Sequence, residues 1–376
     1  MGDGDLRDVT LVTPPDDRGA IAFAEQLLAL LDGARVSTTY KFAVLLGLMD
    51  VCLADFRRDG HAPDSVTTRR LAEAVTALYW HQLAPFRPGD PTTVLRQTRT
   101  GQHAELLAPI ARARATLAGG GAAPLGRVRA RARREYDALV REVEWKLVEM
   151  PLPRLQTVGG REVRFIYAIT WTTDIKRRVF NDPDAFDNQI RFVAGAGDHL
   201  VRLNGLLRPM LQRRWALEVS RYNPIAALDA QLEAHLFGVD RITLAPMKAP
   251  LRELQDGRCF YCQGRLREPQ VDHFIPHARI PLDAIENLVL ADATCNRNKC
   301  DALAASAHVD AWAARLRDRA ADLRTIAAAA DWESAPDHAL GVARALYLPI
   351  TPQALLWASI DTFVPPDKAA LRGALA

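Results

Sequence analysis

The sequence predicts a mainly α-helical protein that contains one short segment of different composition. Hydrophobic periodicity typical of helices recurs along most of the 376 residues, and the clearest strand pattern is confined to residues 152–171. Four of the five cysteines fall between residues 259 and 300. We therefore expect N-terminal and C-terminal helical regions, a small hairpin near 152–171, and an inserted unit at about 252–306.

The N-terminal part is predicted to be a flexible tail followed by a helical bundle. Residues 1–19 are rich in Asp, Gly and Pro, and residues 20–118 hold three stretches with helical periodicity. The second stretch, "STTYKFAVLLGLMDVCLADF", is apolar on nearly all sides, so we expect it at the buried centre of the bundle. The sequence "AGGGAAP" at 118–124 predicts a break after the bundle.

The middle region, residues 125–250, is predicted to be helical with the short hairpin inside it. The sequence "LGRVRARARREYDALVREVEWKLVEM" has the pattern of one long helix. The hairpin is predicted by a Gly-Gly turn followed by β-branched and aromatic residues. Asp182 as cap and Pro183 at the first helical position predict a further helix, continuing to about Tyr222 with a break near Gly195–Gly197.

The C-terminal region is predicted to be helical. Residues 307–376 have a helical pattern, interrupted at "YLPITP" and "FVPPD".

The N-terminus and the bulk composition predict a cytoplasmic protein without a membrane partner. The N-terminus is acidic and polar, and the longest apolar run, "FAVLLGLM", is far too short to span a bilayer. The net charge of +3 is small, so any surface that attracts nucleic acid has to be local.

Three clustered cysteines predict a structural zinc site. Cys259 and Cys262 in "CFYC" have the two-residue separation of a zinc knuckle, and Cys295 in "TCNRNKC" follows about thirty residues later. Clustered cysteines in a chain without an export signal indicate metal binding rather than disulfides. The three thiolates would leave one position of a tetrahedral zinc ion open.

The fourth zinc ligand has more than one candidate in the sequence. Asp292 lies three residues before Cys295 and repeats the C-x-x-C spacing with a carboxylate. Cys300 lies five residues after Cys295, which is an awkward step of about 140° around a helix. His308 is more distant. We expect Asp292 to be the ligand, with Cys300 as the alternative.

Between the two halves of the knuckle, the stretch "VDHFIP" places an acid beside an imidazole. Asp272 and His273 end a predicted strand, and the following proline prevents its continuation. Neighbouring strand residues normally point to opposite faces, so joint action on one phosphate requires a strand end or a bulge at this point. Asn287 opens the stretch "NLVL", and Asn296 follows a cysteine in "CNRNK".

These elements resemble the HNH endonuclease family. "CFYC", "VDHFIP", "NLVL" and "CNRNK" occur in the order and spacing of that family's motifs and cover about 50 residues. The resemblance implies a ββα-metal fold, in which a hairpin and a helix hold one catalytic divalent ion, with a separate zinc in many members. Two departures are visible: the last motif position is Asn rather than His, and Asp292 replaces a cysteine.

The chemistry of phosphodiester hydrolysis and the resemblance together suggest a role for each residue. His273 suits the general base, and the oxygens of Asp272 and Asn296 suit Mg²⁺ or Mn²⁺. Asn287 is expected to hold the loop and orient the histidine. Lys299 is expected either to approach the phosphate or to be solvated. The remaining expected contacts to the nucleic-acid backbone are Arg279 and Arg297.

The function predicted from these residues is metal-dependent cleavage of DNA, in the setting of restriction or anti-phage defence that the resemblance suggests. The alternatives are a nuclease subunit of a larger complex, an RNase, and a zinc-knuckle protein that binds nucleic acid without cleaving it. An HNH centre cuts one strand, so a homodimer or other defence subunits are expected partners for double-strand cleavage.

Overall fold

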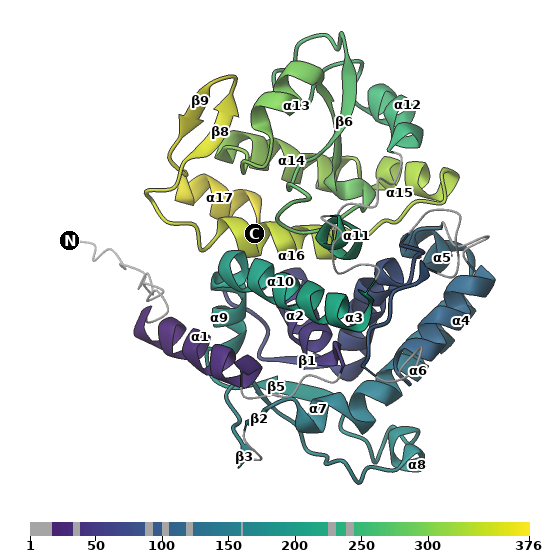
Figure 1. Ribbon diagram of the computed structural model, residues 1–376. Helices are drawn as coiled ribbons and strands as arrows, with labels where there is room; N and C mark the ends of the chain where they lie inside the picture. The colour runs from purple at the N-terminus through teal and green to yellow at the C-terminus, as the bar shows by residue number, and fades with distance from the viewer. Residues whose placement is uncertain are drawn as a thin grey trace.

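The computed structural model describes residues 17–32, 38–86, 93–99, 105–117, 123–158, 161–224, 231–237 and 244–376. Most of the predicted N-terminal tail therefore lies outside the described residues, and helix α1 (Asp17–Asp32) already includes its last three positions. The fold is mainly helical, as the sequence predicts, with only small sheets among the described residues. Figure 1 shows a helical body below and the cysteine-containing unit above it.

Helix α2 (Tyr40–Ala54) forms the centre of the body. All of its residues except Tyr40, Lys41 and Asp50 are buried, which is the expected result of an apolar surface on nearly every side. It packs against α3 (Thr68–Gln82), α9 (Ala196–Arg202), α10 (Asn204–Tyr222) and α16 (Pro336–Tyr347). Helices α4 (Leu107–Leu117) and α6 (Arg133–Glu149) cover α3 from the other side.

The long helix predicted after residue 124 is two helices, α5 (Leu125–Arg131) and α6. They are separated by Ala132, whose φ of −126° and ψ of 56° are not helical. Two arginines of α5 form ion pairs with the segment that precedes α16: Arg129 with Glu333 and Arg131 with Asp331. Pairing to a distant segment explains why the chain changes direction within a continuous helical pattern.

The predicted hairpin is present in a shorter form than its sequence pattern suggested. Strands β2 (Thr157–Val158) and β3 (Arg161–Glu162) pair in antiparallel fashion, while the residues before them form helix α7 (Pro151–Arg154). The aromatic part, β4 (Tyr167–Ala168), belongs to a different sheet of order β1–β5–β4. Its other members are β1 (Ser65–Thr67) and β5 (Gln189–Phe192).

The helix predicted to start at Asp182 was wrong. Helix α8 (Arg177–Phe180) ends before it, and the Asp182 side chain accepts a hydrogen bond from the backbone N–H of Asp184, which closes a turn. The residues that follow the turn lead into β5. The break predicted near Gly195–Gly197 is present, because Gly195, with a φ of 79°, directly precedes α9. From α9 the chain continues through α10 and α11 (Leu232–Phe237).

The cysteine-containing unit is a two-stranded ribbon followed by a helix. Strand β6 (Pro269–His273) pairs with β7 (Leu288–Asp292) in an antiparallel register without a bulge, and α13 (Ala293–Lys299) follows directly. Helix α12 (Ala245–Leu254) and the 3₁₀ turn η3 (Ile285–Asn287) flank the ribbon. These elements form the small ββα arrangement that the sequence predicted.

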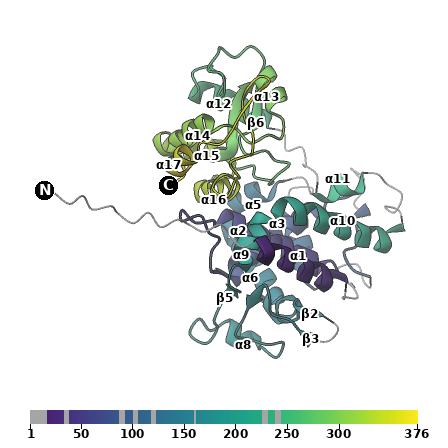
Figure 2. The same cartoon turned by 90° about the vertical axis from the view of Figure 1, so that its left-hand side faces the viewer.

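The C-terminal region joins the ββα unit to the helical body. Helices α14 (Ser306–Asp318), α15 (Ala320–Ala329) and α17 (Lys368–Ala374) accompany α16, which lies between the unit and the body in Figures 1 and 2. A Cβ atom at Gly341 of α16 would lie 1.7 Å from the Ala54 carbonyl oxygen, so this close crossing needs glycine. A hairpin of β8 (Leu356–Ser359) and β9 (Thr362–Val364) was not predicted.

Most buried apolar side chains of the body and of the ββα unit belong to one continuous core, and Trp145, Val148 and Phe180 form a separate small cluster. The division of the chain at residues 118, 250 and 306 stays a prediction from the sequence. Among the described helices, none combines the length and apolar character needed to cross a membrane.

Candidate functional site

The ribbon and helix α13 are held in place by Asp292, which ends β7 and caps the helix. One of its carboxylate oxygens accepts a hydrogen bond from the N–H of Thr294, at 3.3 Å, and the other accepts from the N–H of Arg267, at 3.1 Å. These bonds lower the pKa of Asp292, the Arg267 contact being the largest cause. The cap fixes where α13 begins relative to the strand that carries Asp272 and His273.

Asp272 lies against a buried lysine. The carboxylate oxygen Oδ2 is 3.0 Å from Nζ of Lys299 and accepts a hydrogen bond from the hydroxyl of Tyr261 at 2.5 Å. Lys299 also donates to the carbonyl oxygen of His273 at 2.9 Å, and its side chain is 0% exposed. The expectation that Lys299 approaches phosphate or is solvated was therefore wrong, because the lysine holds the end of β6 from inside the protein.

Two oxygens near this ion pair keep free lone pairs. Oδ1 of Asp272 has no hydrogen-bond partner among the described residues, since both of its contacts use Oδ2. Asn296 donates through Nδ2 to Oε1 of Gln270 at 2.9 Å, and its own Oδ1 accepts nothing from the described part of the chain. Gln270 and Asp272 are two positions apart on β6, so their side chains lie on the same face of the strand. Two such oxygens fit the preference of Mg²⁺ or Mn²⁺ for oxygen ligands.

His273 has different partners from those of its neighbour. Its Nε2 lies 2.7 Å from Oδ1 of Asp283, and its ring makes an edge contact with the ring of His277, 5.1 Å between centroids. Because a carboxylate only accepts hydrogen bonds, Nε2 carries the hydrogen and Nδ1 has the lone pair. The arrangement leaves one ring nitrogen able to accept a proton.

Asp283 was not identified from the sequence. Burial alone would raise the pKa of its carboxyl, but the hydrogen bond from His273 and the electrostatic effect of the nearby imidazoles bring the pKa below the usual value. Burial is also the main cause of a lowered pKa at His277. The Asp283 carbonyl oxygen accepts a hydrogen bond from Nε1 of Trp332 at 2.6 Å. The sequence held no signal for Asp283, because an acidic residue ten positions after a histidine has no spacing specific to a site.

Asn287 is completely buried and holds the loop between the two strands. Its Oδ1 accepts from the N–H of Ile275 at 2.7 Å, and its Nδ2 donates to the carbonyl oxygens of Ile275 and Leu282. The Asn287 backbone carbonyl accepts from the N–H of Phe274, next to His273. Asn287 therefore ties together the two ends of the loop that follows the histidine, and none of its hydrogen bonds is to the imidazole.

The three predicted cysteines meet in space. The Sγ atoms of Cys259, Cys262 and Cys295 all lie within 4.8 Å of one another, from the loop before β6 and from the first turn of α13. Burial and the neighbouring thiols raise the pKa of Cys295. Three thiols this close are unfavourable as thiolates without a cation, and a metal such as Zn²⁺ supplies that charge. The donor set fits zinc.

The expected fourth ligand does not join this group. The Asp292 carboxylate caps α13 as described above, and its backbone N–H lies 3.3 Å from Sγ of Cys259. Cys300 is exposed at the end of α13 with a φ of 48°, outside the group of three thiols. Nε2 of His308 donates a hydrogen bond to the carbonyl oxygen of Ala358 at 2.8 Å. Among the described residues, no Asp, Glu or His completes the set.

The two arginines expected to contact a nucleic-acid backbone differ in their surroundings. Arg279 donates from Nε to the carbonyl oxygen of Asp301, and its side chain is exposed. Arg297 is exposed on α13 and forms no ion pair with any described residue. Arg297 follows Asn296 directly on α13, so it lies within one turn of a residue proposed to bind the ion.

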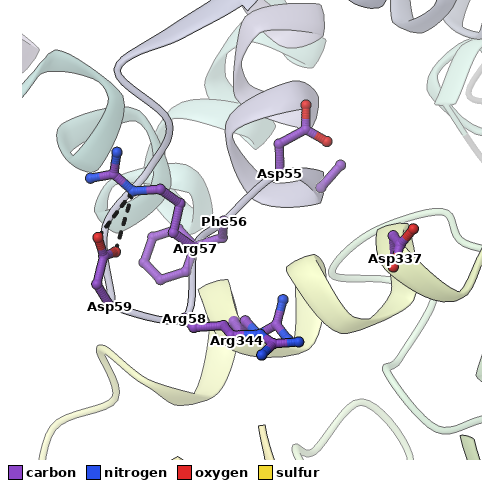
Figure 3. A pocket seen from close by; sticks show the side chains of 8 residues that line it. Asp55, Phe56, Arg57, Arg58, Asp59, Asp337 and Arg344 are labelled. Atoms are coloured by element: carbon purple, nitrogen blue, oxygen red, sulfur yellow. Dashed lines mark hydrogen bonds and ion pairs between the residues drawn. The ribbon is translucent and has the colours of Figure 1, made fainter. Parts of the chain in front are cut away.

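Two hollows occur near the junction of the unit and the body. A cavity of about 260 Å³ includes His277 and Asp283 in its wall. A larger hollow of about 570 Å³, at the end of α2 and beside α16, includes Arg58 and Arg344 and contains none of the residues discussed above (Figure 3). The larger hollow contains none of the candidate catalytic or metal-binding residues of β6 and α13. We therefore place the chemistry at β6 and α13 and not in this hollow.

Comparison with known proteins identifies the unit. Residues 259–305 match the model of a family described as HNH endonuclease. A search of curated proteins and a search of solved structures each found no match. The matched segment contains the three cysteines, β6, β7 and most of the contacts described above. Residues 259–305 are therefore an HNH endonuclease domain, and this domain implies a nucleic-acid substrate.

Proposed function

We propose that the protein is a metal-dependent endonuclease that hydrolyses phosphodiester bonds of DNA, with His273 as the general base. The observation that carries the proposal is the hydrogen bond between Nε2 of His273 and the Asp283 carboxylate. In the neutral ring it fixes the tautomer in which Nε2 carries the hydrogen and Nδ1 has the lone pair. General-base catalysis needs such a nitrogen and a partner that stabilises the charge it acquires.

The proton transfer follows from this tautomer. A water molecule at the scissile phosphate gives a proton to Nδ1 of His273 while its oxygen bonds to phosphorus. The bond from phosphorus to the leaving deoxyribose oxygen then breaks, and that oxygen takes up a proton from solvent. Asp283 stabilises the imidazolium ion because its carboxylate lies 2.7 Å from Nε2.

A single Mg²⁺ or Mn²⁺ ion would be held by Oδ1 of Asp272 and Oδ1 of Asn296. When bound, such an ion supplies positive charge to the phosphate as the negative charge increases during the reaction. Lys299 and Tyr261 keep the Asp272 carboxylate in one orientation, and Asn287 fixes the loop that follows His273. Zn²⁺ at Cys259, Cys262 and Cys295 would hold the loop that carries Tyr261 against α13.

The alternative functions can be compared by what each requires of His273, Asp283 and the surface charge. A zinc-knuckle protein without catalysis has no need for a polar His273–Asp283 pair that is largely shielded from solvent, with side chains 13% and 24% exposed. An RNase would use the same base and ion. The net charge of +3 is compatible with a nuclease subunit that receives part of its nucleic-acid contact from a partner.

The test is cleavage of supercoiled plasmid DNA in Mg²⁺ or Mn²⁺ by the wild type and by His273→Ala. We expect the variant to lose at least about a hundredfold in rate, the lower range for removal of a general base, while its DNA affinity is unchanged. His61→Ala is the matched control, because His61 pairs with Asp198 in the helical body. Undiminished cleavage by His273→Ala contradicts the mechanism, and cleavage of RNA alone supports the RNase.

We further propose a role in restriction or anti-phage defence. The support is the presence of an HNH endonuclease domain beside a helical region of different composition. Plaque counts on cells that carry the wild type should fall relative to cells that carry His273→Ala. Equal plaque counts across a panel of phages would contradict this setting and leave the nuclease assignment intact.

A further inference from the structure

The cavity behind His273 lies between the HNH endonuclease domain and the helical body. Its volume is about 260 Å³, and its wall includes the loop from His277 to Asp283 on one side and residues of α2, α3 and α10 on the other. The segment before α16 and the start of α5 close it. A space with walls from both parts of the molecule is a common place for a small-molecule site.

Most charges around this cavity already have partners. Arg70 pairs with Asp55 and Glu73, Arg208 with Asp50, and Arg129 with Glu333. These pairs neutralise one another, so they set the shape of the wall without attracting an ion of either sign. The charge preference of the cavity is therefore decided by the groups that are left over.

Two of the polar groups left over in the wall indicate the kind of ligand. Nε of Arg127 is buried and has no hydrogen-bond partner within the described chain. The ring of His338 makes no hydrogen bond with any described residue, and burial lowers its pKa to about 4, so it is neutral at pH 7. The charge of Arg127 acts on Asp331, but its buried Nε–H lacks an acceptor and suits one phosphate or carboxylate oxygen, while a neutral imidazole offers one donor and one acceptor to a heterocycle.

The remaining wall is apolar and partly aromatic. Tyr136, Phe237 and Trp332 line the cavity together with aliphatic side chains of α2 and α3. Aromatic walls favour a flat ring. The volume is just below the range of about 300–1,000 Å³ that is typical of sites for drug-sized ligands, so it suits a mononucleotide and excludes a dinucleotide.

The cavity is also connected to the catalytic histidine through two short contacts. Trp332 and Asp283 both belong to its wall, and Nε1 of Trp332 donates to the Asp283 carbonyl oxygen at 2.6 Å. The Asp283 carboxylate in turn holds His273. A molecule in the cavity would contact the residues that fix the orientation of the base, so its binding would alter how His273 is held.

We propose that this cavity binds a nucleoside monophosphate, with the phosphate on Arg127 and the base between the aromatic side chains near His338, and that its occupation changes the rate of the nuclease. The effect on rate rests on the function proposed above; the binding does not. The nucleotide is either free in solution or the phosphorylated end of a nucleic-acid strand, which has the same chemistry.

The test is calorimetric titration of the full-length protein, without divalent ions, with AMP, GMP, CMP and UMP. We expect at least one to bind, and Arg127→Gln to weaken that binding by about tenfold or more, as for loss of a charged hydrogen bond. Arg133→Gln is the matched control, because Arg133 pairs with Asp137 on the exposed side of α6 and lies outside the cavity wall. His338→Gln provides a second variant with an intact Arg127.

The outcomes separate binding from regulation. No binding by any of the four nucleotides below about 1 mM contradicts the site, as does equal binding by wild type and both cavity variants. Binding that leaves the plasmid cleavage rate unchanged contradicts the regulatory link. Because His273→Ala should still bind the nucleotide, loss of the proposed nuclease function does not remove this readout. Competition by a 5′-phosphorylated oligonucleotide identifies a strand end as the source, and its absence identifies the free nucleotide.

Discussion

The two faces of strand β6 have different partners, although Asp272 and His273, which point to opposite faces, are adjacent in the sequence. Asp272 is bound by Tyr261 and Lys299, which belong to the cysteine loop and to α13, inside the HNH endonuclease domain. His273 is bound by Asp283, whose loop reaches the helical body through Trp332. The alternation of a strand thus separates the side proposed for metal binding from the side proposed for proton transfer. Both sides also contact the rest of the protein: the ring of Tyr261 packs against His308 and Trp357 of the C-terminal region, and the Asp283 loop contacts Trp332.

Removal of the zinc ion should affect the Asp272 side most strongly. Tyr261 lies between Cys259 and Cys262, so a zinc ion at the three cysteines would hold the residue that donates to Asp272. We expect chelation, or Cys262→Ser, to abolish protection from hydrogen exchange in β6 and α13, because structural zinc contributes about 10 kcal/mol or more of binding free energy. Helix α2 of the body should keep its protection. Equal loss in both regions would contradict a local role for the cysteines.

Replacement of the buried lysine should have the next largest effect. Lys299→Met leaves the Asp272 carboxylate buried without its partner, which typically costs about 3–5 kcal/mol of unfolding free energy. Urea unfolding followed by tryptophan fluorescence measures the loss. Arg297→Met, an exposed neighbour on α13, is the control and should change the free energy by less than about 0.5 kcal/mol. Asp272→Asn added to Lys299→Met should recover most of the loss.

Removal of the carboxylate on the other face should affect activity rather than folding. We expect Asp283→Asn to lower kcat by about tenfold to a hundredfold, the usual loss for a group that orients a functional histidine, with KM unchanged. Steady-state cleavage of a labelled duplex measures both constants. A rise in KM with constant kcat would assign Asp283 to substrate binding and remove its role beside His273.

The same variant should change the acid sensitivity of the fold. The folded protein lowers the pKa of Asp283, so its carboxylate stabilises the fold above the unfolded pKa of about 4, and this contribution is lost as the pH falls through the lower folded value. The stability difference between wild type and Asp283→Asn should therefore be constant near pH 7 and shrink below about pH 4. Thermal unfolding at a series of pH values measures it.

The residues around β6 also differ in how well the sequence alone could predict their roles. Cys259, Cys262 and Cys295 were predicted because metal ligands need fixed residue types at short separations, and the three thiols meet as predicted. Lys299 was misjudged because its position on a short helix could not reveal that Asp272 lies beneath it. Asp283 was missed for the reason that its contact depends on a loop conformation set by Asn287 and Trp332.

The limits of prediction in the body have a different cause. Long helices were visible from periodicity, whereas β1 and β5 pair across more than a hundred residues, Ser65 with Arg191, and neither strand has a strong local pattern. The turn at Asp182 carries the residues of a helix start, yet its side chain closes a turn instead. Local chemistry therefore predicted the functional unit better than the surrounding scaffold.

The most direct test of the account is Mn²⁺ binding followed by electron paramagnetic resonance on zinc-loaded protein. The two-faced arrangement of β6 predicts one Mn²⁺ per chain in the wild type and in His273→Ala, because the histidine binds no ion. Asn296→Ala should weaken that binding by about tenfold or more, since it removes one of two protein ligands. Loss of the ion in His273→Ala, or unchanged affinity in Asn296→Ala, would contradict the separation of metal binding and proton transfer.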